Sequence, residues 1–181
     1  MKKTLFALCI IVIAGCGPVH HRDAFHGSLG QLKDQNDVIA AATRLFVCTD
    51  TRDWSCVQDV FAPEVHFDMT SLGAPQAEKK TPKQIAAMWD EGLKALTAIH
   101  HQAGNFQAAI RGNEADLSCY GVAYHYLPNP TNQNIRTFVG SYTFHLVRGE
   151  GGWKIDRFKF TVKFIDGNKD LEGSAKKANG K

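Results

Sequence analysis

Two carboxylates and two histidines are the residues of this chain best suited to acid–base chemistry. Asp50 and Asp53 lie in one short stretch, residues 49–54, and His101 and His125 follow much later in the chain. Removal of a proton beside a carbonyl group needs a base, and the oxyanion or leaving hydroxyl that results needs an acid. Aspartate and histidine can divide these roles, because histidine titrates near neutral pH and an apolar pocket raises the pKa of a carboxylate.

The position of Asp50 allows two interpretations. Apolar residues recur at helical spacing over residues 38–49, so Asp50 would emerge at the inner end of a helix whose apolar face packs on the core. In the alternative, Asp50 is the N-cap of a helix over residues 51–60, and Asp53 complements the positive end of that helix. Spacing alone favours the cap, so the choice depends on what lies near Asp50 in space.

The N-terminus has the pattern of a secretory signal peptide. Two lysines precede an apolar stretch over residues 5–13, which is too short to span a bilayer. Residues 13–16, Ile-Ala-Gly-Cys, resemble a bacterial lipobox, and this resemblance implies cleavage before Cys16 and attachment of a lipid to its thiol. Gly17 resembles the pattern for transfer to the outer membrane. We therefore expect a signal peptide over residues 1–15 and a mature chain anchored in the bacterial cell envelope, at the outer membrane; the alternative is an ordinary signal peptide.

The rest of the chain predicts one domain between two flexible ends. Residues 16–34 lack apolar periodicity and predict a tether, whose three histidines have no companion ligands for a defined zinc site. Residues 35–172 are long enough for one domain with its own core. Residues 173–181 contain no apolar residue larger than alanine and predict a disordered tail.

The charge of the mature chain gives no support for a nucleic-acid partner. The full chain has 21 Lys+Arg and 18 Asp+Glu, and loss of the two lysines in residues 1–15 leaves 19 against 18, a formal charge of +1. No basic stripe with interleaved aromatic residues is present. The sequence also lacks a phosphate loop, a dinucleotide fingerprint and a nucleophile elbow. We therefore expect neither a cofactor nor a metal.

Three cysteines remain in the domain in an oxidising compartment. Cys48 and Cys56 flank residues 49–54, so a disulfide between them is conceivable, although sequence supplies neither the distance nor the side-chain directions. In the alternative, these two and Cys119 are small buried hydrophobic residues. We favour the buried thiols.

The apolar pattern changes from helical to alternating in the second half of the chain. Thr81, followed by a proline, gives a helix start, and a helical stripe runs from there to Leu96. Four alternating segments follow and predict antiparallel neighbours, because turn-forming residues separate them. They cover residues 98–110, 115–127, 135–148 and 152–166. Helices followed by strands predict an α+β fold with helices on one side of a curved antiparallel sheet.

The last of these segments has the clearest period of two. Its apolar residues alternate with polar ones, so one face is packed and the other, with Lys159 and Lys163, faces solvent. The predicted packed face comprises Phe158, Phe160, Val162 and Phe164.

The order of several short motifs resembles the SnoaL-like branch of the nuclear transport factor 2-like superfamily, which is similar to scytalone dehydratase, steroid delta-isomerase and polyketide cyclases. The resemblance covers roughly residues 37–171. It implies a sheet wrapped around N-terminal helices, a cone-shaped cavity, chemistry without a cofactor, and a possible homodimer through the sheet. The motifs lie at residues 50–54, 61–65, 101–105, 112–115, 152–155 and 165–168.

The resemblance also implies roles for individual residues. It places a pocket carboxylate at Asp50 and the catalytic histidine at His101. A second pocket histidine falls at His125 or is replaced by Tyr126, because a shift of one residue in register exchanges the two faces of a strand.

The sequence departs from the family pattern where two pocket tyrosines are expected. Thr49 and Met69 stand at those positions, so two hydroxyl groups are missing or weakened. Tyr120, Tyr124 and Tyr126 are candidates to replace them, and Trp54 is a further candidate pocket residue.

Two functions follow from different classes. The first is a cofactor-independent dehydratase or isomerase that acts on a small apolar or carbonyl-bearing molecule with Asp50 and His101. The alternative is a non-catalytic envelope lipoprotein that binds an apolar ligand or a protein partner, and membrane anchoring favours it. The discriminating observation is whether Asp50 and His101 converge on one pocket.

Overall fold

The structure is a computed structural model that describes residues 20–178, with side chains described for residues 29–175. The predicted signal peptide and Cys16 lie outside the described residues. Within the described part of the chain, no helix is long and apolar enough to cross a membrane.

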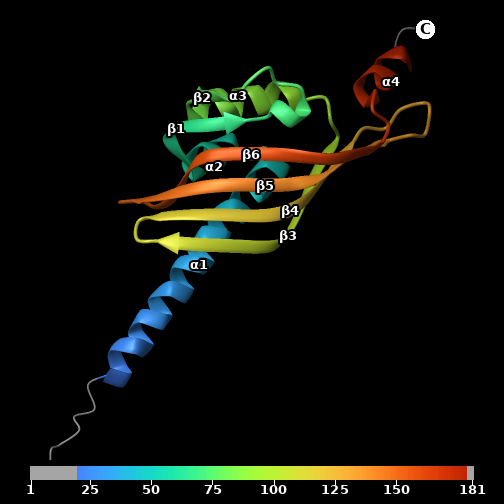
Figure 1. Ribbon diagram of the computed structural model, residues 1–181. Coiled ribbons are helices and arrows are strands. Elements are labelled where there is room, and N and C mark those ends of the chain that lie inside the picture. Colours follow the sequence, from blue (N-terminus) through green and yellow to red (C-terminus); the bar gives the residue numbers. More distant parts are fainter. Residues whose placement is uncertain (1–19, 179–181) are drawn as a thin grey trace, which may run out of the picture.

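Six strands form one curved sheet in the order β2-β1-β6-β5-β4-β3 (Figure 1). Strands β3 to β6 form an antiparallel meander, as the alternating pattern predicts. β1 joins β6 in parallel, and β2 is a short antiparallel edge strand that the sequence did not indicate. The strands are β1 (Phe61–Asp68), β2 (Glu78–Lys80), β3 (Ala98–Arg111), β4 (Glu114–Tyr126), β5 (Ile135–Gly149) and β6 (Gly152–Gly167).

Among the described residues, three α-helices precede this meander in the chain and one follows it. In Figure 1, α1 and α2 lie behind the sheet, and the N-terminal part of α1 extends beyond it. The arrangement confirms the predicted α+β fold, in which N-terminal helices pack on one face of a curved sheet. The helices are α1 (His20–Asp50), α2 (Trp54–Val60), α3 (Pro82–Leu93) and α4 (Leu171–Ala178), with a short 3-10 helix η1 (Thr70–Leu72).

The flexible tether predicted over residues 16–34 is wrong from His20 onward, because α1 begins there and continues without a break. Asp34 ties this part of the helix to the sheet, since its Oδ2 lies 2.5 Å from Nη2 of Arg148 in β5. A helix that projects into solvent needs no apolar stripe, and its polar composition therefore resembles that of a linker.

The disordered tail predicted over residues 173–181 is wrong for the part that belongs to α4. The helix is anchored by its first residue, Leu171, which is fully buried against Leu96 and Ile99. The composition of the tail itself contains no sign of this anchor. Burial of Leu171 directly before the predicted tail therefore helps to order the start of α4.

The core lies between α1 and the inner face of the sheet. α1 contributes apolar side chains at helical spacing, and the strands contribute them at alternate positions. The largest fully buried side chains include Phe144, Leu45, Ile85, Leu117, Leu146 and Ile155.

Strand β6 differs from the predicted face pattern at Phe164. Phe160 is 3% exposed, whereas Phe164 is 56% exposed. Val162 pairs with Gly140, but Phe164 pairs with the adjacent Val139, so β6 has one extra residue at this point. An extra residue exchanges the faces of everything beyond it. Phe164 therefore points to the outer face of the sheet, and the prediction that it is packed is wrong.

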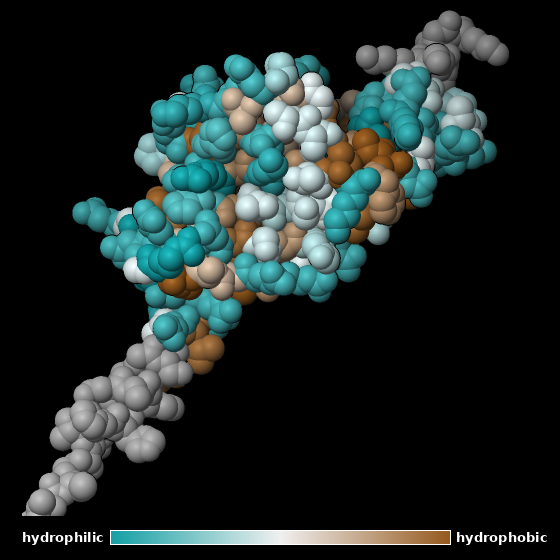
Figure 2. All heavy atoms as spheres, viewed as in Figure 1, coloured by the Kyte–Doolittle hydropathy of each residue, from teal (hydrophilic) through white to brown (hydrophobic). Residues whose placement is uncertain are grey.

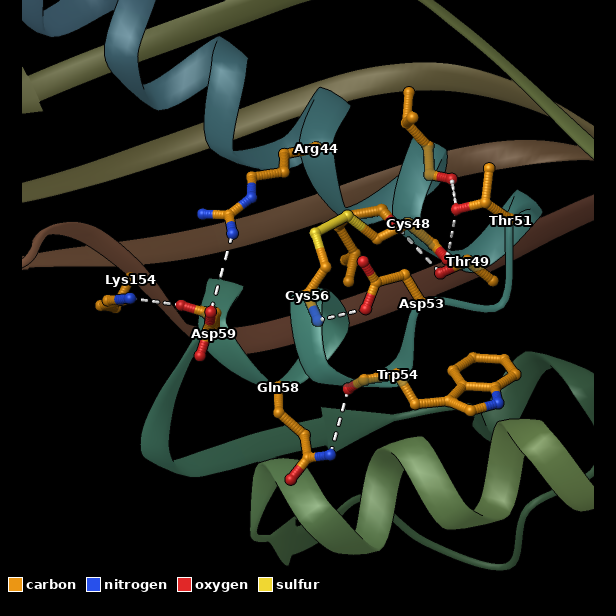
Figure 3. The surroundings of a disulfide bond; sticks show 12 residues. Arg44, Cys48, Thr49, Thr51, Asp53, Trp54, Cys56, Gln58, Asp59 and Lys154 are labelled. Carbon is orange, nitrogen blue, oxygen red and sulfur yellow. Dashed lines mark hydrogen bonds and ion pairs between the residues drawn. A yellow bond between two sulfur atoms is a disulfide. The ribbon is translucent and has the colours of Figure 1, made fainter.

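Cys48 and Cys56 form a disulfide that joins the end of α1 to α2 (Figure 3). Their Cα atoms are 5.8 Å apart, within the usual range for a disulfide. The preference for three free buried thiols is therefore wrong for this pair. It is right for Cys119, which is free and buried, and burial raises the pKa of its thiol to about 12. The disulfide closes a loop that contains Asp50.

Candidate functional site

Asp50 ends α1 and holds His101 through two contacts. Its Oδ1 lies 2.6 Å from Nδ1 of the His101 ring, and its Oδ2 accepts the backbone N–H of His101 at 2.8 Å. A carboxylate accepts hydrogen bonds, so Nδ1 carries the ring hydrogen and Nε2 keeps a free lone pair. The N-cap of α2 is Asp53, whose side chain accepts the N–H of Cys56. Asp50 is therefore not the helix cap that its spacing suggested.

His101 faces inward from β3, while its neighbour His100 has a side chain that is 69% exposed. The His101 ring stacks on Phe46 of α1, with ring centroids 5.4 Å apart. Phe46 lies one helical turn before Asp50, so α1 provides both the stacking partner and the carboxylate. Nε2 of His101 has no partner among the described residues and is not sealed in the core. It is therefore the ring atom that a molecule in the adjacent cavity would meet.

A cavity of about 150 Å³ lies between α1, α3 and the inner face of the sheet. In another protein, an apolar cavity of roughly this volume holds one benzene ring. Five of the lining residues have a nitrogen or oxygen in the side chain: Thr49, Trp89, His101, His125 and Tyr142. Asp50 is behind His101 rather than in the lining. The apolar wall includes Leu45, Phe46, Trp89, Phe138, Phe158 and Phe160.

The three tyrosines of β4 and Trp54 were predicted to line the pocket and do not do so. Tyr120 and Tyr126 are 55% and 36% exposed, and all three tyrosines lie on the outer face of β4. The register of β4 turns His125 inward, so the residue beside it must face outward. Trp54 points from α2 towards α3 (Figure 3). Its Nε1 donates to Asp90 of α3 at 2.8 Å. All four are corrections to the predicted site.

His125 is the second imidazole in the cavity, opposite Arg136 on β5. Its Nδ1 lies 3.2 Å from Nη2 of Arg136. Burial and the positive charge of Arg136 lower the pKa of His125 to about 4. The ring is therefore neutral at neutral pH.

Tyr142 lines the cavity from β5 and was not among the predicted site residues. Its ring packs on Gly121 of β4, where any Cβ would overlap the ring. Burial raises the pKa of Tyr142, so its hydroxyl group keeps its proton. The alternating pattern of β5 could have identified Tyr142, because it is two residues from the inward-facing Phe144 and so lies on the same face. Tyr120 and Tyr126 lie on the outer face of β4.

Thr49 and Met69 line the cavity, at the positions where the resemblance expects tyrosines. The Thr49 hydroxyl donates to the carbonyl oxygen of Leu45 at 2.8 Å, which commits its hydrogen to the helix. Among the described residues, no three or more of histidine, cysteine, aspartate and glutamate lie together in a way that could hold a metal ion. The polar groups available in the cavity are therefore its two imidazoles, the Tyr142 phenol and the indole N–H of Trp89.

This arrangement can transfer protons. A free imidazole nitrogen of His101 borders apolar space, and the Asp50 carboxylate behind it can orient the ring and stabilise the imidazolium that forms when the nitrogen accepts a proton. His125 adds a neutral ring on the same cavity. Tyr142 adds a hydroxyl group.

Solved structures share this fold across most of the chain. The Kfla4162 protein from Kribbella flavida matches with a TM-score of 0.72 at 19% identity, over 75% of this chain and 95% of that one. Hexachlorocyclohexane dehydrochlorinase LinA-type3 from Novosphingobium barchaimii LL02 matches with a TM-score of 0.67 at 10% identity, over 78% and 94% of the two chains. An NTF2-like protein with a cystatin-like fold from Novosphingobium aromaticivorans matches with a TM-score of 0.67 at 17% identity, over 87% and 97%. At these identities the matches show a common fold.

The sequence itself matches a family model. No curated protein matches this chain. The model for the SnoaL-like domain matches residues 30–159, which is more than half of the chain and includes Asp50, His101 and His125. Together with the curved sheet and its helices, this match shows that the chain belongs to the SnoaL-like domain family, with the nuclear transport factor 2-like fold.

Proposed function

We propose that the cavity binds a small, largely apolar molecule that carries a carbonyl group, and that His101 removes a proton from the carbon beside that group without a cofactor. The observation that carries this proposal is the 2.6 Å contact between Asp50 and His101 at the edge of an apolar cavity. Asp50 orients the ring and stabilises its protonated form.

The proposed step is balanced without an oxidant or a reductant. In a dehydration, Nε2 of His101 takes the proton, and the electron pair of the C–H bond forms the new double bond as a hydroxyl leaves the adjacent carbon. The protonated His101 returns the proton to that hydroxyl, which departs as water. In an isomerisation, His101 would return the proton to a different carbon of the same molecule.

Size and lining limit the substrate. A volume of about 150 Å³ suits a molecule with a single ring. The apolar wall favours a neutral molecule, because a charged one would lose its hydration. The name of the LinA-type3 neighbour, a dehydrochlorinase, denotes removal of hydrogen and chlorine, and this supports an elimination.

Native mass spectrometry of the purified full-length chain tests the ligand class, because a retained carbonyl compound would identify a substrate to assay. Once that compound is identified, the variant Asp50→Asn tests the catalytic role of the Asp50–His101 pair. It keeps the size of the side chain but removes the charge that stabilises the imidazolium, so we expect turnover to fall while thermal unfolding changes little. Full activity in Asp50→Asn would show that the catalytic assignment is wrong.

The apolar character of most of the cavity wall also favours a second function, binding of an apolar ligand without turnover. The variant Asp50→Asn also distinguishes binding from catalysis. For a binding protein, Asp50→Asn would leave the dissociation constant of the retained ligand nearly unchanged, because Asp50 is not in the lining, and no product would form with the wild-type chain.

We extend the proposal to the location of the protein. A lipid on Cys16 would hold the domain at the outer membrane, and α1, which extends beyond the sheet in Figure 1, would set its distance from the surface. Cys16→Ser should release the chain from membranes. If the variant still sediments with membranes and the processed wild-type chain has no added acyl mass, the proposed lipid anchor on Cys16 is wrong.

A homodimer through the outer face of the sheet is the remaining part of the proposal. Figure 2 shows this face, with apolar atoms gathered beside α4. Its exposed large side chains are Tyr120, Tyr124, Tyr126, Ile135 and Phe164. Phe164→Glu should convert a dimer to a monomer in light scattering measured after size-exclusion chromatography. A monomeric wild-type chain would contradict this part.

A further inference from the structure

Arg136 is the partner of His125 and is itself held from the far end of the chain. Its Nη1 and Nη2 donate to Oε2 and Oε1 of Glu172 at 2.7 and 2.6 Å, in the forked geometry that fits a guanidinium to a carboxylate. The Arg136 side chain is only 15% exposed, and it stacks over Phe138 at 5.3 Å. Its Nη2 also contacts Nδ1 of His125 at 3.2 Å.

Glu172 belongs to α4, and the start of α4 is fixed to the domain. The adjacent Leu171 is fully buried. Asn168 donates through its side-chain amide to the carbonyl of Gln133 at 3.0 Å and to the hydroxyl of Ser174 at 3.1 Å. The C-terminal helix is therefore a structural support that reaches the cavity through Glu172, Arg136 and His125, and it lies beyond the part of the chain that the family model matches.

The contact with Arg136 determines where His125 carries its hydrogen. A guanidinium group has donors and no acceptor, so Nδ1 of His125 must accept. In a neutral imidazole the hydrogen is then on Nε2. Nε2 of His125 has no partner among the described residues and is not sealed in the core, and the ring lines the cavity.

We propose that Arg136, fixed by Glu172, is a positioning residue that holds His125 as a neutral hydrogen-bond donor, with its Nε2–H available to an acceptor oxygen of the ligand. The inference rests on the proposed function for the identity of that oxygen, which is the substrate's carbonyl. The two cavity histidines thus have opposite roles: Asp50 leaves His101 with a lone pair, and Arg136 leaves His125 with a hydrogen.

The charges around His125 agree with this role. Burial is the main cause of its lowered pKa, and the positive charge of Arg136 adds to the effect, whereas the negative charges of Glu172 and Asp50 oppose it. A neutral donor of this kind can stabilise the negative charge that grows on a carbonyl oxygen when the neighbouring carbon loses its proton.

The tautomer can be measured directly on the full-length chain labelled with ¹⁵N, without a substrate. Two-bond ¹H–¹⁵N correlation spectra distinguish a protonated ring nitrogen from a bare one, and the loss of signals in His125→Asn assigns the ring. We expect wild-type His125 to carry its hydrogen on Nε2 alone at pH 7 and pH 5.5. A hydrogen on Nδ1, or on both nitrogens at pH 7, would overturn the inference, and this measurement needs no variant of Arg136 or Glu172.

Arg136→Met removes the donor and should give a mixture of the two tautomers, with a His125 pKa that moves up towards 6.5. Arg136→Lys keeps a donor and should restore part of the Nε2–H form. Arg148→Met is a matched control, because Arg148 also pairs with a carboxylate, Asp34, and stacks over an aromatic ring, Trp153, at 4.4 Å. An unchanged His125 spectrum in Arg136→Met, or an equal change in Arg148→Met, would contradict the proposal.

The ligand class is tested with benzaldehyde and toluene, which share a ring and differ in the carbonyl group. We expect benzaldehyde to shift the Nε2–H signal of His125 in the wild type, and toluene to leave it in place. Equal shifts, or none from benzaldehyde, would refute the donor role. An Nε2–H tautomer combined with full activity in Asp50→Asn would instead refute the proposed reaction and leave the positioning of His125 intact.

Discussion

The two faces of the sheet each carry a histidine paired with an aspartate at the same distance. On the inner face, Nδ1 of His101 lies 2.6 Å from Asp50, and on the outer face, Nδ1 of His145 lies 2.6 Å from Asp156. Both histidine side chains are 13% exposed. Pair geometry and burial of the ring therefore do not distinguish a candidate catalytic pair from a structural one.

The second ring nitrogen makes the difference. Nε2 of His145 lies 4.0 Å from Oε2 of Glu114, so the outer histidine has carboxylates on both sides, as in an ion-pair network. Nε2 of His101 has no partner among the described residues, and its ring lines the apolar cavity. A histidine–carboxylate pair becomes a candidate for proton transfer when its free nitrogen faces a space that a substrate can enter.

The largest expected effect compares these two histidines. His101→Ala should lower kcat/KM for the identified carbonyl substrate by about 10²- to 10⁴-fold, because it removes the proposed base. His145→Ala should leave kcat/KM within about twofold, since its pair lies on the other face of the sheet. Steady-state kinetics on both variants checks this, and comparable losses of activity would show that the inner pair has no special role.

The next effect compares two phenylalanines on one strand. Phe160→Ala should lower the free energy of unfolding by about 3 to 5 kcal/mol, because it leaves a cavity in the core. Phe164→Ala should change it by about 0.5 kcal/mol or less in the monomer, because Phe164 lies on the outer face. Urea denaturation measures both changes. If the two variants were equally destabilised, the assignment of Phe164 to the outer face beyond the bulge in β6 would be wrong.

The disulfide provides a third test of the difference between the two histidine–aspartate pairs. It closes the loop around Asp50 and lies far in sequence from Asp156. Replacement of both Cys48 and Cys56 by serine should lower the free energy of unfolding by about 2 to 3 kcal/mol, as expected for the closure of a short loop. The Cβ protons of Asp50 should then broaden in NMR spectra, and those of Asp156 should not. Broadening at both sites would mean that the disulfide supports the whole domain rather than this corner.

The smallest effect is a pH dependence of stability that His125 contributes. Its pKa is about 4 in the folded chain and about 6.5 when unfolded, so between these values the unfolded chain binds more protons, and stability falls as the pH falls. We expect the wild type to lose about 1 kcal/mol more than His125→Asn between pH 7 and pH 5.5. Urea denaturation at the two pH values provides the comparison, and parallel behaviour of the two chains would exclude a buried neutral His125.

Much of the fold could be predicted because it depends on local patterns. The four long strands begin and end within a few residues of the alternating segments, and Thr81 caps α3 with the reciprocal hydrogen bonds that its sequence indicates. The strand β2 and the helix α4 could not be predicted in this way. β2 consists of charged residues whose pairing depends on β1, and α4 depends on the burial of Leu171.

The candidate site was predictable only in part. His101 and His125 do face the cavity, and Asp50 does meet His101, but the family resemblance rather than spacing selected these residues. Spacing favoured a helix cap at Asp50, and aromatic character favoured Tyr120 and Tyr126. The aromatic character of a residue does not determine which side of the sheet it faces, because its place in the alternation along the strand does.

The sequence by itself determined the extents of the long strands and which of their positions share a face, except beyond the bulge in β6, because side chains alternate along a regular strand. Only the tertiary structure decided which of the inward residues meet. Asp50 and His101 are 51 positions apart in sequence, and Arg136 and Glu172 are 36 apart. These contacts depend on where α1 crosses the sheet and where α4 docks, and both placements arise from the packing of many side chains at once rather than from any local pattern.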